Sequence, residues 1–396
     1  MKILMILDEE FPPDVRVEKE IRTLEKNGHQ IHLLTYTRKD QAFTDSYNSV
    51  KVKRIVISKL MYKLKALALV LPFYFNFWKK FIKNEIEKND FDVIHVHDLT
   101  LVSTVLKIGR KHNIPVIGDY HENRPEIMKL YDHVKSFPGN ILISVNKWQK
   151  FQAKYSNLLD RLILVTKEAK DYYIKNFGLE EKKVFVVPNY VDLDDLSKFR
   201  IDDKIVREYS NKFMLVYFGD TGSRRGTITV LETALELQND IENRDVHFVI
   251  IGDSREQSKL EERVIELKLK NVKLTGYMPI EKAASYFSAA DAGLCPFLRN
   301  IHHDTTYSNK MFQYMAFGKP VIVSNCPSQA NLVKENNCGL VFTAGDSKML
   351  KQKIIDLKNK KIYKELSDNS LVCVKDKFNT SVADDELIKV YASLQN

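Results

Sequence analysis

The chain contains the stretch Asp304-Thr-Thr-Tyr-Ser-Asn-Lys-Met-Phe-Gln-Tyr-Met-Ala-Phe-Gly-Lys-Pro-Val-Ile-Val-Ser324, which decides the fold class. Ser308 is a favourable N-cap residue, and the apolar residues from Lys310 to Phe317 have helical spacing. Gly318 ends the helix, and the apolar run after Pro320 predicts a short buried strand. A helix followed at once by a buried strand predicts an α/β fold with a parallel sheet.

The same alternation of short apolar runs and longer amphipathic segments extends along the whole chain. Buried parallel strands covered by helices have this pattern. The runs expected to form strands are Lys2–Leu7, Gln30–Thr35, Val93–His97, Val116–Gly118, Leu162–Thr166, Val184–Val187, Met214–Phe218, Val246–Ile251, Val272–Thr275, Ala292–Pro296, Pro320–Ser324 and Gly339–Phe342. The expected helices include Val17–Lys26, Thr100–Lys111, Thr229–Gln238, Lys259–Leu269, Ile280–Ala289, Lys310–Phe317 and Val382–Gln395. The pattern restarts after Pro188, which predicts two doubly wound, Rossmann-like halves.

The 396 residues are too many for one hydrophobic core, which rarely exceeds roughly 250–300 residues. We expect a first domain, 1–190, a second domain, 191–380, and a C-terminal helix, 381–396, that crosses back to the first domain. A composition of 44% hydrophobic and 29% charged residues excludes a disordered or fibrous chain. Because open parallel sheets bind ligands beyond the carboxyl ends of their strands, the loops after strands are the expected place of the chemistry.

The net charge of +9 is concentrated in the N-terminal half. Residues 1–190 carry 32 basic and 23 acidic side chains, and the remaining residues carry 29 of each. Nine Lys and Arg residues and no acidic residue lie between Asp45 and Glu85, within a basic segment, 51–83, whose centre is apolar. This segment has two interpretations: a core helix with a solvated basic face, or a contact with an anionic membrane surface. No nucleic-acid motif accompanies the charge, so nucleic acid is not an expected partner.

The sequence predicts neither a membrane-spanning helix nor a secretory signal. The apolar run from Ala66 to Trp78 is shorter than the roughly 20 residues that a span requires. The first apolar run, Met1–Leu7, is followed at once by acidic residues. No Cys-x-x-Cys spacing occurs among the cysteines, Cys295, Cys326, Cys338 and Cys373. They indicate neither a zinc site nor disulfides, so a reducing cytoplasm is the expected location.

The N-terminus of the helix that begins at Lys310 suits a phosphate group. Its free backbone amides near Ser308 and Asn309, with the Lys310 ammonium, favour an anion such as a diphosphate. Gln313 lies one turn on, on the same face, where its amide can reach hydroxyl groups. The other interpretation is an ordinary capped helix.

A second phosphate candidate is the loop Phe218-Gly-Asp-Thr-Gly-Ser-Arg-Arg-Gly226, which follows a strand and precedes a helix. It matches neither the dinucleotide fingerprint nor the P-loop. Gly222, Arg224 and Arg225 still suit phosphate, because Arg binds it through two parallel hydrogen bonds. The other interpretation is a surface turn with solvated arginines.

Histidines and acids follow two strands of the first half, in His95-Val-His97-Asp98 and Asp119-Tyr-His121-Glu122. A neutral histidine can donate to a sugar hydroxyl or a phosphate oxygen. His121 is the candidate functional residue, whereas His95, inside its strand, is expected to be a core histidine. The spacing of these residues is not diagnostic of a metal site.

Further short motifs occur in a fixed order along the chain. They are Asn27-Gly-His-Gln-Ile31, Asp92-Val-Ile-His-Val-His97, His121, Val187-Pro-Asn-Tyr-Val-Asp192, Arg225-Gly226, Ile251-Gly-Asp253, Thr275-Gly-Tyr277, Ala290-Asp-Ala-Gly-Leu-Cys-Pro296 and Gly318-Lys-Pro-Val-Ile322. Together they resemble the retaining glycosyltransferases of family 4, which have the GT-B fold, over nearly the whole chain. The resemblance implies two Rossmann-like domains that face each other across a cleft. The second would hold a nucleotide sugar and the first its acceptor.

The resemblance also implies roles for individual residues. Arg225 stands where a diphosphate-binding Lys usually does, Tyr277 and Met278 lie where the nucleobase packs, and His121 lies on the acceptor side. The implied catalytic residues are His121, Arg225 and Lys310. The implied donor-binding residues are Gly222, Arg224, Arg225, Tyr277, Met278, Asp304, Thr305, Thr306, Ser308, Asn309, Lys310 and Gln313. The implied acceptor-side residues are Asp14, Arg16, His97 and His121.

Three positions depart from the pattern of this family. Its pair of glutamates is replaced by Thr305 and Gln313, of which Gln313 can still bond ribose hydroxyls. The usual Arg after the first glycine of the second domain is Asp220, so the two arginines that follow are expected to compensate. The N-terminal Gly-Gly loop is replaced by Pro12-Pro-Asp-Val-Arg16.

The implied reaction transfers a hexosyl or N-acetylhexosaminyl group from a nucleoside diphosphate sugar, UDP-sugar being favoured, to a hydroxyl of a glycan or lipid-linked acceptor. Configuration is retained, the context is surface polysaccharide or glycolipid synthesis, and no metal or other cofactor is expected. The alternatives are a nucleotide-sugar epimerase of the same fold and a non-catalytic partner of another transferase. The expected location is the cytoplasm, with peripheral contact at the inner face of the cell membrane as an extension of it.

Overall fold

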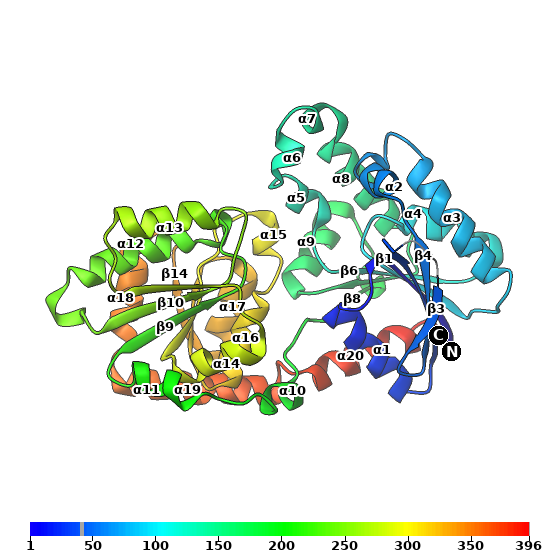
Figure 1. Ribbon diagram of the computed structural model, residues 1–396. Coiled ribbons are helices and arrows are strands. Elements are labelled where there is room, and N and C mark those ends of the chain that lie inside the picture. Colours follow the sequence, from blue (N-terminus) through cyan, green and yellow to red (C-terminus); the bar gives the residue numbers. More distant parts are fainter. Residues whose placement is uncertain (40–42, 396) are drawn as a thin grey trace. The chain divides into compact units, whose positions relative to one another are not determined.

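The computed structural model describes residues 1–39 and 43–395. It divides into two compact units: unit 1 comprises Met1–Pro188 with Asp384–Asn396, and unit 2 comprises Asn189–Ala383. Each unit has a sheet with helices on both faces, which is parallel throughout in unit 2 and parallel except for one edge strand in unit 1, so the expected Rossmann-like architecture is confirmed (Figure 1). The division falls inside the last helix, α20 (Thr380–Ala392), whose residues from Asp384 onward belong to unit 1. Residue 396, the end of the expected C-terminal helix, lies outside the described residues.

Unit 1 is built on a sheet with the strand order β3-β4-β2-β1-β5-β6-β7-β8. Its strands are β1 (Lys2–Glu10), β2 (Gln30–Thr37), β3 (Phe43–Tyr47), β4 (Val50–Val56), β5 (Val93–His97), β6 (Val116–Tyr120), β7 (Arg161–Leu164) and β8 (Val184–Val186). Neighbouring strands are parallel except for the edge pair β3 and β4. This pair is not among the expected strands, because its charged side chains are not typical of a buried parallel strand.

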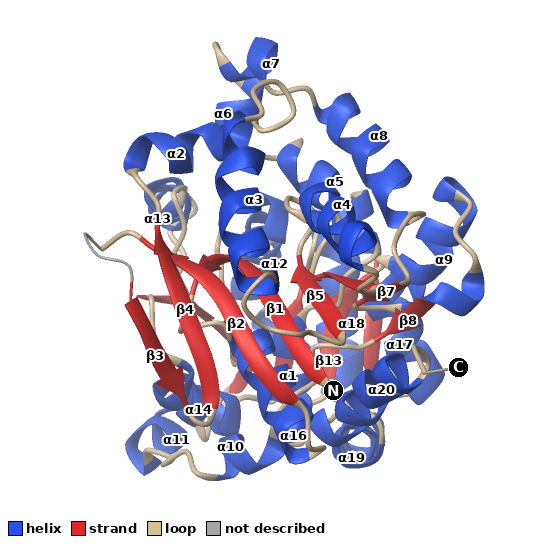
Figure 2. Ribbon diagram, turned by 90° about the vertical axis from the view of Figure 1, so that its right-hand side faces the viewer, coloured by secondary structure: helices blue, strands red, loops and turns tan. Residues whose placement is uncertain are grey.

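The helices of unit 1 cover both faces of this sheet. They are α1 (Val15–Lys26), α2 (Lys59–Leu64), α3 (Phe73–Ile86), α4 (Val102–His112), α5 (Arg124–Met128), α6 (Asp132–Lys135), α7 (Gly139–Leu142), α8 (Val145–Ser156), α9 (Lys167–Phe177) and the end of α20. Alternate strand residues such as Leu4 and Ile94 pack in one core with α3, α4 and α8. On the opposite face, α1 and α20 are joined by a hydrogen bond from Thr23 to Asp384 (Figure 2).

Unit 2 has an all-parallel sheet with the strand order β11-β10-β9-β12-β13-β14. The strands are β9 (Phe213–Phe218), β10 (Val246–Ile251), β11 (Val272–Gly276), β12 (Ala292–Cys295), β13 (Val321–Ser324) and β14 (Gly339–Phe342). The helices are α10 (Leu193–Ser197), α11 (Asp203–Tyr209), α12 (Thr227–Gln238), α13 (Gln257–Glu266), α14 (Ile280–Ala289), α15 (Ile301–Asp304), α16 (Asn309–Ala316), α17 (Pro327–Asn336), α18 (Ser347–Leu357) and α19 (Lys360–Asp376). Met214 and Val216 face one core, and Leu215 and Tyr217 face the other.

The basic segment 51–83 is divided between β4, α2, a 3-10 turn (Lys65–Leu67) and α3. In α3, Tyr74, Trp78 and Ile82 recur every four residues and are fully buried, so this helix is a core helix with exposed lysines on its other face. Among the described residues, no helix combines the length and apolar character that a membrane crossing needs.

Part of the charge of the basic segment is neutralised inside unit 1. Lys65 is buried, and its Nζ lies 2.8 Å from Glu9 Oε1 and 3.2 Å from Asp8 Oδ2. Lys53 pairs with Glu85, and Arg54 pairs with Asp45. The exposed cations of the segment are therefore fewer than its sequence indicates.

Candidate functional site

Cationic side chains of unit 2 gather around Phe297 at the carboxyl edge of the sheet. The Arg225 guanidinium lies 4.9 Å from the centre of the Phe297 ring, and Lys310 Nζ lies 5.7 Å from it. Lys310 Nζ also lies 3.8 Å from the centre of the Tyr217 ring. The loop after β9, the loop after β12 and the first turn of α16 thus bring together two of the three expected catalytic residues, Arg225 and Lys310.

Asp220 anchors both arginines of the loop after β9. Its Oδ2 accepts hydrogen bonds from Arg224 Nη2 at 2.8 Å and from Arg225 Nε at 3.3 Å. Its Oδ1 accepts from the Gly222 amide at 2.9 Å. Burial would raise the pKa of Asp220, but the Gly222 amide and the two arginines outweigh it and lower that pKa. The carboxylate that departs from the family pattern therefore holds the two arginines.

The loop after β9 passes so close to neighbouring atoms that it needs glycine at both of its ends. Gly219 has a φ of 116°, and a Cβ there would lie 3.2 Å from Lys310 Nζ. Gly226 has a φ of 79°, and a Cβ there would lie 1.8 Å from the carbonyl oxygen of Pro296. These glycines let the cations of the loop pack against Lys310 and Phe297.

Burial makes the charge of Lys310 costly in the free protein. Desolvation, with a smaller contribution from the Arg225 charge, lowers the pKa of Lys310 to about 7. The carboxylate of Asp220 partly opposes this effect but already accepts hydrogen bonds from the arginines. An anion placed beside Lys310 would restore its charged form, which is the property of an anion-binding lysine.

Two neighbouring histidines of this site, His302 and His303, were not expected from the sequence. The His303 ring stacks on Phe297 with ring centres 4.4 Å apart, and its Nδ1 lies 2.7 Å from the Leu298 carbonyl oxygen. Burial lowers the pKa of His302 to about 3 and that of His303 to about 4, so both are neutral at pH 7. The His-His pair in a loop after a strand was the available signal.

The expected donor-sugar residues already have partners in the structure. Arg299 Nε and Nη2 donate to the two carboxylate oxygens of Asp304 at 2.6 and 2.9 Å. Thr305 Oγ1 donates to the Ile301 carbonyl at 2.7 Å, and the Thr306 carbonyl accepts from Ser328. Asp304, which stands beside the position of the family's first glutamate, is therefore bound to Arg299.

The remaining donor-binding candidates lie at the same edge of unit 2. Ser308 is the N-cap residue of α16, as expected, although its side chain makes no capping hydrogen bond. Asn309 is exposed in the first turn, and Gln313 follows one turn later with a buried Oε1. Beyond β11, Tyr277 is exposed, and Met278 packs against the core of this unit.

In unit 1, the acceptor-side candidate Arg16 is buried in an ion-pair cluster. Its Nε and Nη2 donate to the two oxygens of Asp119 at 2.8 and 2.7 Å, and its Nη1 donates to the Val187 carbonyl at 2.9 Å. Glu20, one turn later on α1, lies 3.1 Å from Arg16 Nε. Arg16 thus joins α1, β6 and the segment after β8 rather than lying on a surface.

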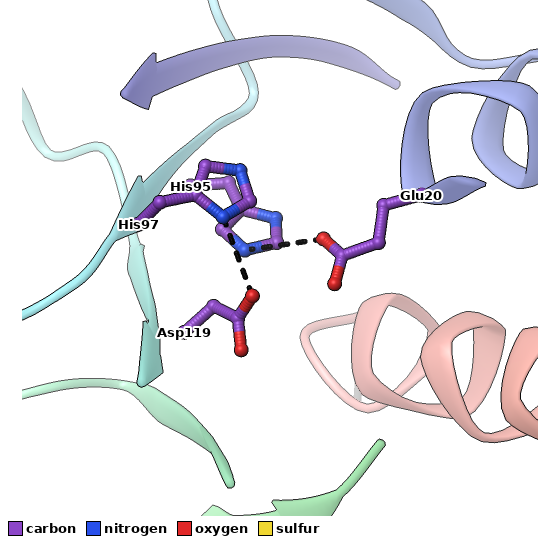
Figure 3. A group of neighbouring side chains, drawn as sticks. All are labelled: Glu20, His95, His97 and Asp119. Carbon is purple, nitrogen blue, oxygen red and sulfur yellow. Dashed lines mark hydrogen bonds and ion pairs between the residues drawn. The ribbon is translucent and has the colours of Figure 1, made fainter. Parts of the chain in front are cut away.

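His95 and His97 complete this cluster on the same side of β5. Their rings stack with centres 4.5 Å apart, and both are fully buried, as expected for His95 (Figure 3). Figure 3 shows Glu20 and Asp119 pointing toward these rings from α1 and β6. His95 Nδ1 lies 2.7 Å from the hydroxyl of Tyr391 in α20, a contact that sequence reasoning missed.

His121 is the partly exposed member of the acceptor-side candidates at the end of β6. Its Nε2 lies 3.0 Å from Asp119 Oδ2 and 3.3 Å from His97 Nδ1, and 19% of its side chain is exposed. Asp14 instead caps α1 by accepting from the amides of Arg16 and Val17. His121 is therefore the member of this group best placed to meet a ligand.

The charges of this cluster are set by burial and by the Arg16–Asp119 pair. Burial would raise the pKa of Asp119, but Arg16 and His121 outweigh it and hold that pKa well below its ordinary value. Burial, with the neighbouring Asp119 charge, raises the pKa of Glu20 to about 8. The cluster therefore stabilises the ionised form of Asp119 and disfavours the ionised form of Glu20.

The protonation of His121 gives a testable pH dependence. Burial would lower the pKa of His121, but the Asp98 and Asp119 charges outweigh it and raise the pKa to about 9. The stability that His121 contributes over a His121→Gln variant should be fully present below the unfolded pKa of about 6.5 and lost as pH rises through 9. Denaturant unfolding of both proteins at several pH values measures this difference. A constant difference from pH 6 to 10 would contradict it.

The same cluster is the group of described residues that could offer ligands to a metal ion. Atoms of Glu20, His95, His97 and Asp119 all lie within 4.8 Å of one another. However, both oxygens of Asp119 accept from Arg16, whose guanidinium already supplies a positive charge there. The donor set is therefore a poor fit for a cation.

Comparison with known proteins finds one family model for each of the two units. The model for Glycosyltransferase Family 4 matches residues 15–195, and that for Glycosyl transferases group 1 matches residues 212–360. An uncharacterised glycosyltransferase of Methanocaldococcus jannaschii is 24% identical over 86% of this chain and 83% of its own. The UDP-Gal:alpha-D-GlcNAc-diphosphoundecaprenol alpha-1,3-galactosyltransferase of Escherichia coli is 25% identical over 63% of this chain and 64% of its own.

Solved structures share the fold at low sequence identity. Sucrose-phosphate synthase from Thermosynechococcus elongatus has a TM-score of 0.78 at 15% identity and covers 100% of this chain and 99% of its own. HepE of Anabaena, solved in complex with UDP, has a TM-score of 0.72 at 14% identity and covers 99% of this chain and 100% of its own. Two Rossmann-like units, the ordered motifs and the two family models agree: the chain is a glycosyltransferase with the GT-B fold, built from a Glycosyltransferase Family 4 domain and a group 1 glycosyl transferase domain.

Proposed function

We propose that this glycosyltransferase moves a hexosyl or N-acetylhexosaminyl group from a UDP-sugar to a hydroxyl of a glycan or lipid-linked acceptor, with retained configuration. The observation that carries the proposal is the cation cluster around Phe297, where Arg225 and Lys310 converge and Asp220 anchors the arginines. The name of the Escherichia coli relative supports both the donor class and a diphosphate-lipid acceptor. The comparisons do not favour the epimerase alternative, since the relatives they name are glycosyltransferases.

In the proposed reaction, the bond between the anomeric carbon and the diphosphate oxygen breaks. A bond from that carbon to the acceptor oxygen forms on the same face of the sugar, and the acceptor proton goes to the departing phosphate. Arg224, Arg225 and Lys310 stabilise the charge that develops on the diphosphate. His121, as an imidazolium, donates a hydrogen bond on the acceptor side. No step of this reaction requires a metal.

The finer donor contacts also belong to the proposal. Tyr277 and Met278 would pack against the nucleobase, and Gln313, whose Oε1 is buried, would bond the ribose. Asp304 and the two threonines that follow would border the sugar. We also propose a cytoplasmic location, which is supported by the four free thiols of the chain.

Binding of UDP should be coupled to proton uptake at Lys310. With a pKa of about 7, Lys310 is mostly neutral at pH 8, and a bound diphosphate would restore its charge. UDP affinity should therefore fall as pH rises above 7, and binding at pH 8 should take up close to one proton. Calorimetry in buffers of different ionisation enthalpy measures this uptake. A Lys310→Met variant that still binds UDP with the same uptake would rule out Lys310 as its source.

A donor screen tests the proposed function. UDP- and GDP-sugars are first ranked by thermal shift, and the best are then incubated with lipid-linked acceptors while release of nucleoside diphosphate is measured. The proposal predicts release that requires the acceptor. Conversion of the sugar nucleotide without any acceptor would favour the epimerase alternative. Absence of turnover with every donor would favour the non-catalytic alternative.

A further inference from the structure

Exposed large apolar side chains of unit 1 gather on two segments that we call the α2–α7 surface. The first segment runs from α2 to the start of α3, and the second runs from the end of α5 through α7. Their exposed apolar residues are Leu60, Tyr62, Val70, Phe73, Tyr131, Phe137, Ile141 and Leu142. Large apolar residues scattered singly are ordinary, whereas a gathering of this size marks a contact surface.

The exposure of these residues is high for side chains of their kind. Phe137 is 79% exposed, Ile141 72%, Leu60 69% and Phe73 55%. Figures 1 and 2, which view the molecule from directions 90° apart, both show α2, α6 and α7 at the same end of unit 1. The two segments therefore form one end of this unit and not two opposite faces.

The topology places this end at the carboxyl edge of the sheet. The segment with α2 follows β4, and the segment with α6 and α7 follows β6. Since β4 and β6 run parallel to the strands between them, both segments leave the same edge. His121, the first residue after β6, lies at that edge as well. The α2–α7 surface and His121 thus lie at the same edge of the sheet.

The charge of the α2–α7 surface decides which partner suits it. Exposed Lys59 and Lys63 flank Leu60, and exposed Lys135 lies within the second segment, whereas Lys129 at its start pairs with Glu126 at 2.8 Å. No acidic residue occurs between Asp45 and Glu85, and Asp132 is the acidic residue of the second segment. A second copy of this chain would place the same lysines opposite one another in a two-fold contact, which is unfavourable. An anionic lipid bilayer offers apolar tails and negative headgroups together.

We propose that the α2–α7 surface docks on an anionic phospholipid bilayer, with Phe137, Ile141, Leu60 and Phe73 inserted at the headgroup boundary and the lysines among the headgroups. The inference deepens the proposed function, on which its second part rests: docking holds the edge with His121 close to a lipid-linked acceptor. The exposed lysines of α3 are not part of this docking surface. After Phe73, the apolar side of α3 is buried in the core, so it offers no apolar residues to insert beside these lysines.

Flotation with vesicles tests the docking. The vesicles contain phosphatidylcholine and phosphatidylglycerol in a ratio of about 3 to 1, or phosphatidylcholine alone. The intact protein should float with the anionic vesicles and much less with the neutral ones. The double variant Phe137→Asp/Ile141→Asp should lose at least about tenfold in partitioning, because two apolar side chains would no longer be buried.

The matched control is Ile241→Asp/Ile265→Asp, which replaces two side chains of unit 2 that are 76% and 75% exposed. This control should float like the intact protein. Equal flotation of both double variants, or no flotation of the intact protein, would overturn the proposal. A dimer in sedimentation that only the Phe137→Asp/Ile141→Asp variant loses, without flotation, would assign the surface to a second copy and overturn it too. A thermal shift by UDP checks the proposed function separately, since docking residues should leave it unchanged.

Discussion

Replacing Lys310 by alanine should lower kcat for glycosyl transfer about 10²–10³-fold. Lys310 Nζ lies close to the Tyr217 and Phe297 rings, where it is partly shielded from water and near the Arg225 guanidinium. A cation in such a place stabilises the developing charge of a leaving diphosphate more strongly than a solvated one would. The measurement is the acceptor-dependent release of nucleoside diphosphate at saturating donor, compared with Lys282→Ala, a control at an exposed lysine of the same unit.

The stability of the Lys310→Ala variant separates loss of catalysis from loss of folding. Because the folded pKa of Lys310, about 7, is below the unfolded value of about 10.5, its ammonium destabilises the fold increasingly as pH falls from about 10.5, and the effect is complete below pH 7. Removing it should leave the thermal midpoint unchanged or raise it at pH 6. Near-normal turnover in a folded variant would show that Lys310 does not carry the leaving-group charge.

Replacing Arg16 by methionine should cost about 3–5 kcal/mol of the stability of unit 1. Asp119 is fully buried, and both of its oxygens accept hydrogen bonds from Arg16. Without the guanidinium, a buried carboxylate would be left beside Glu20 and the two strand histidines with much less compensation. The large effect therefore comes from the charge that remains, not from the loss of one contact.

Tryptophan fluorescence reports this effect specifically, since Trp78 and Trp148 are both in unit 1. Denaturant unfolding of Arg16→Met is compared with that of Lys26→Met, which removes an exposed charge from the same helix. Adding Asp119→Asn to Arg16→Met should recover part of the loss, because the unpaired charge is removed. Equal unfolding midpoints for Arg16→Met and Lys26→Met would contradict the importance of this ion pair.

The sequence alone predicted those features of the fold that depend on short, local patterns of residues. Short apolar runs such as Val246–Ile251 predicted buried parallel strands, and the loops after them contain Arg225 and His121, which the structure places at carboxyl edges. The glycine-rich loop and the N-terminus of α16 were singled out from their composition alone. That Lys310 packs beside Arg225 follows from the order of parallel strands, in which β9 pairs with β12.

Partnerships between distant segments could not be predicted from the sequence. Arg16 was expected on the acceptor side, yet it pairs with Asp119, which lies 103 positions away. The hydrogen bond of Tyr391 with His95 spans 296 positions and depends on how α20 packs on unit 1. Asp220 looked like a departure from the family pattern, and its role became visible only when both arginines were found to donate to it.

The α2–α7 surface could not be predicted from the sequence either. The composition of 51–83 indicated a basic and apolar segment, but it did not show which apolar residues are in the core. The periodicity of Tyr74, Trp78 and Ile82 assigns α3 to the core, whereas the exposure of Phe137 and Ile141, far along the chain, had no periodic signal.

In the proposed reaction, the chain transfers a sugar from a UDP-sugar to an acceptor hydroxyl with the help of the cations of unit 2. The most direct test is the transfer of radiolabelled sugar from a UDP-sugar into a diphosphate-lipid acceptor by the intact protein and by Lys310→Ala. The intact protein should form labelled lipid product and release one UDP per sugar transferred, and the variant should lose both. Labelled lipid formed equally by both proteins, or UDP-sugar consumed without labelled lipid, would contradict the proposed reaction.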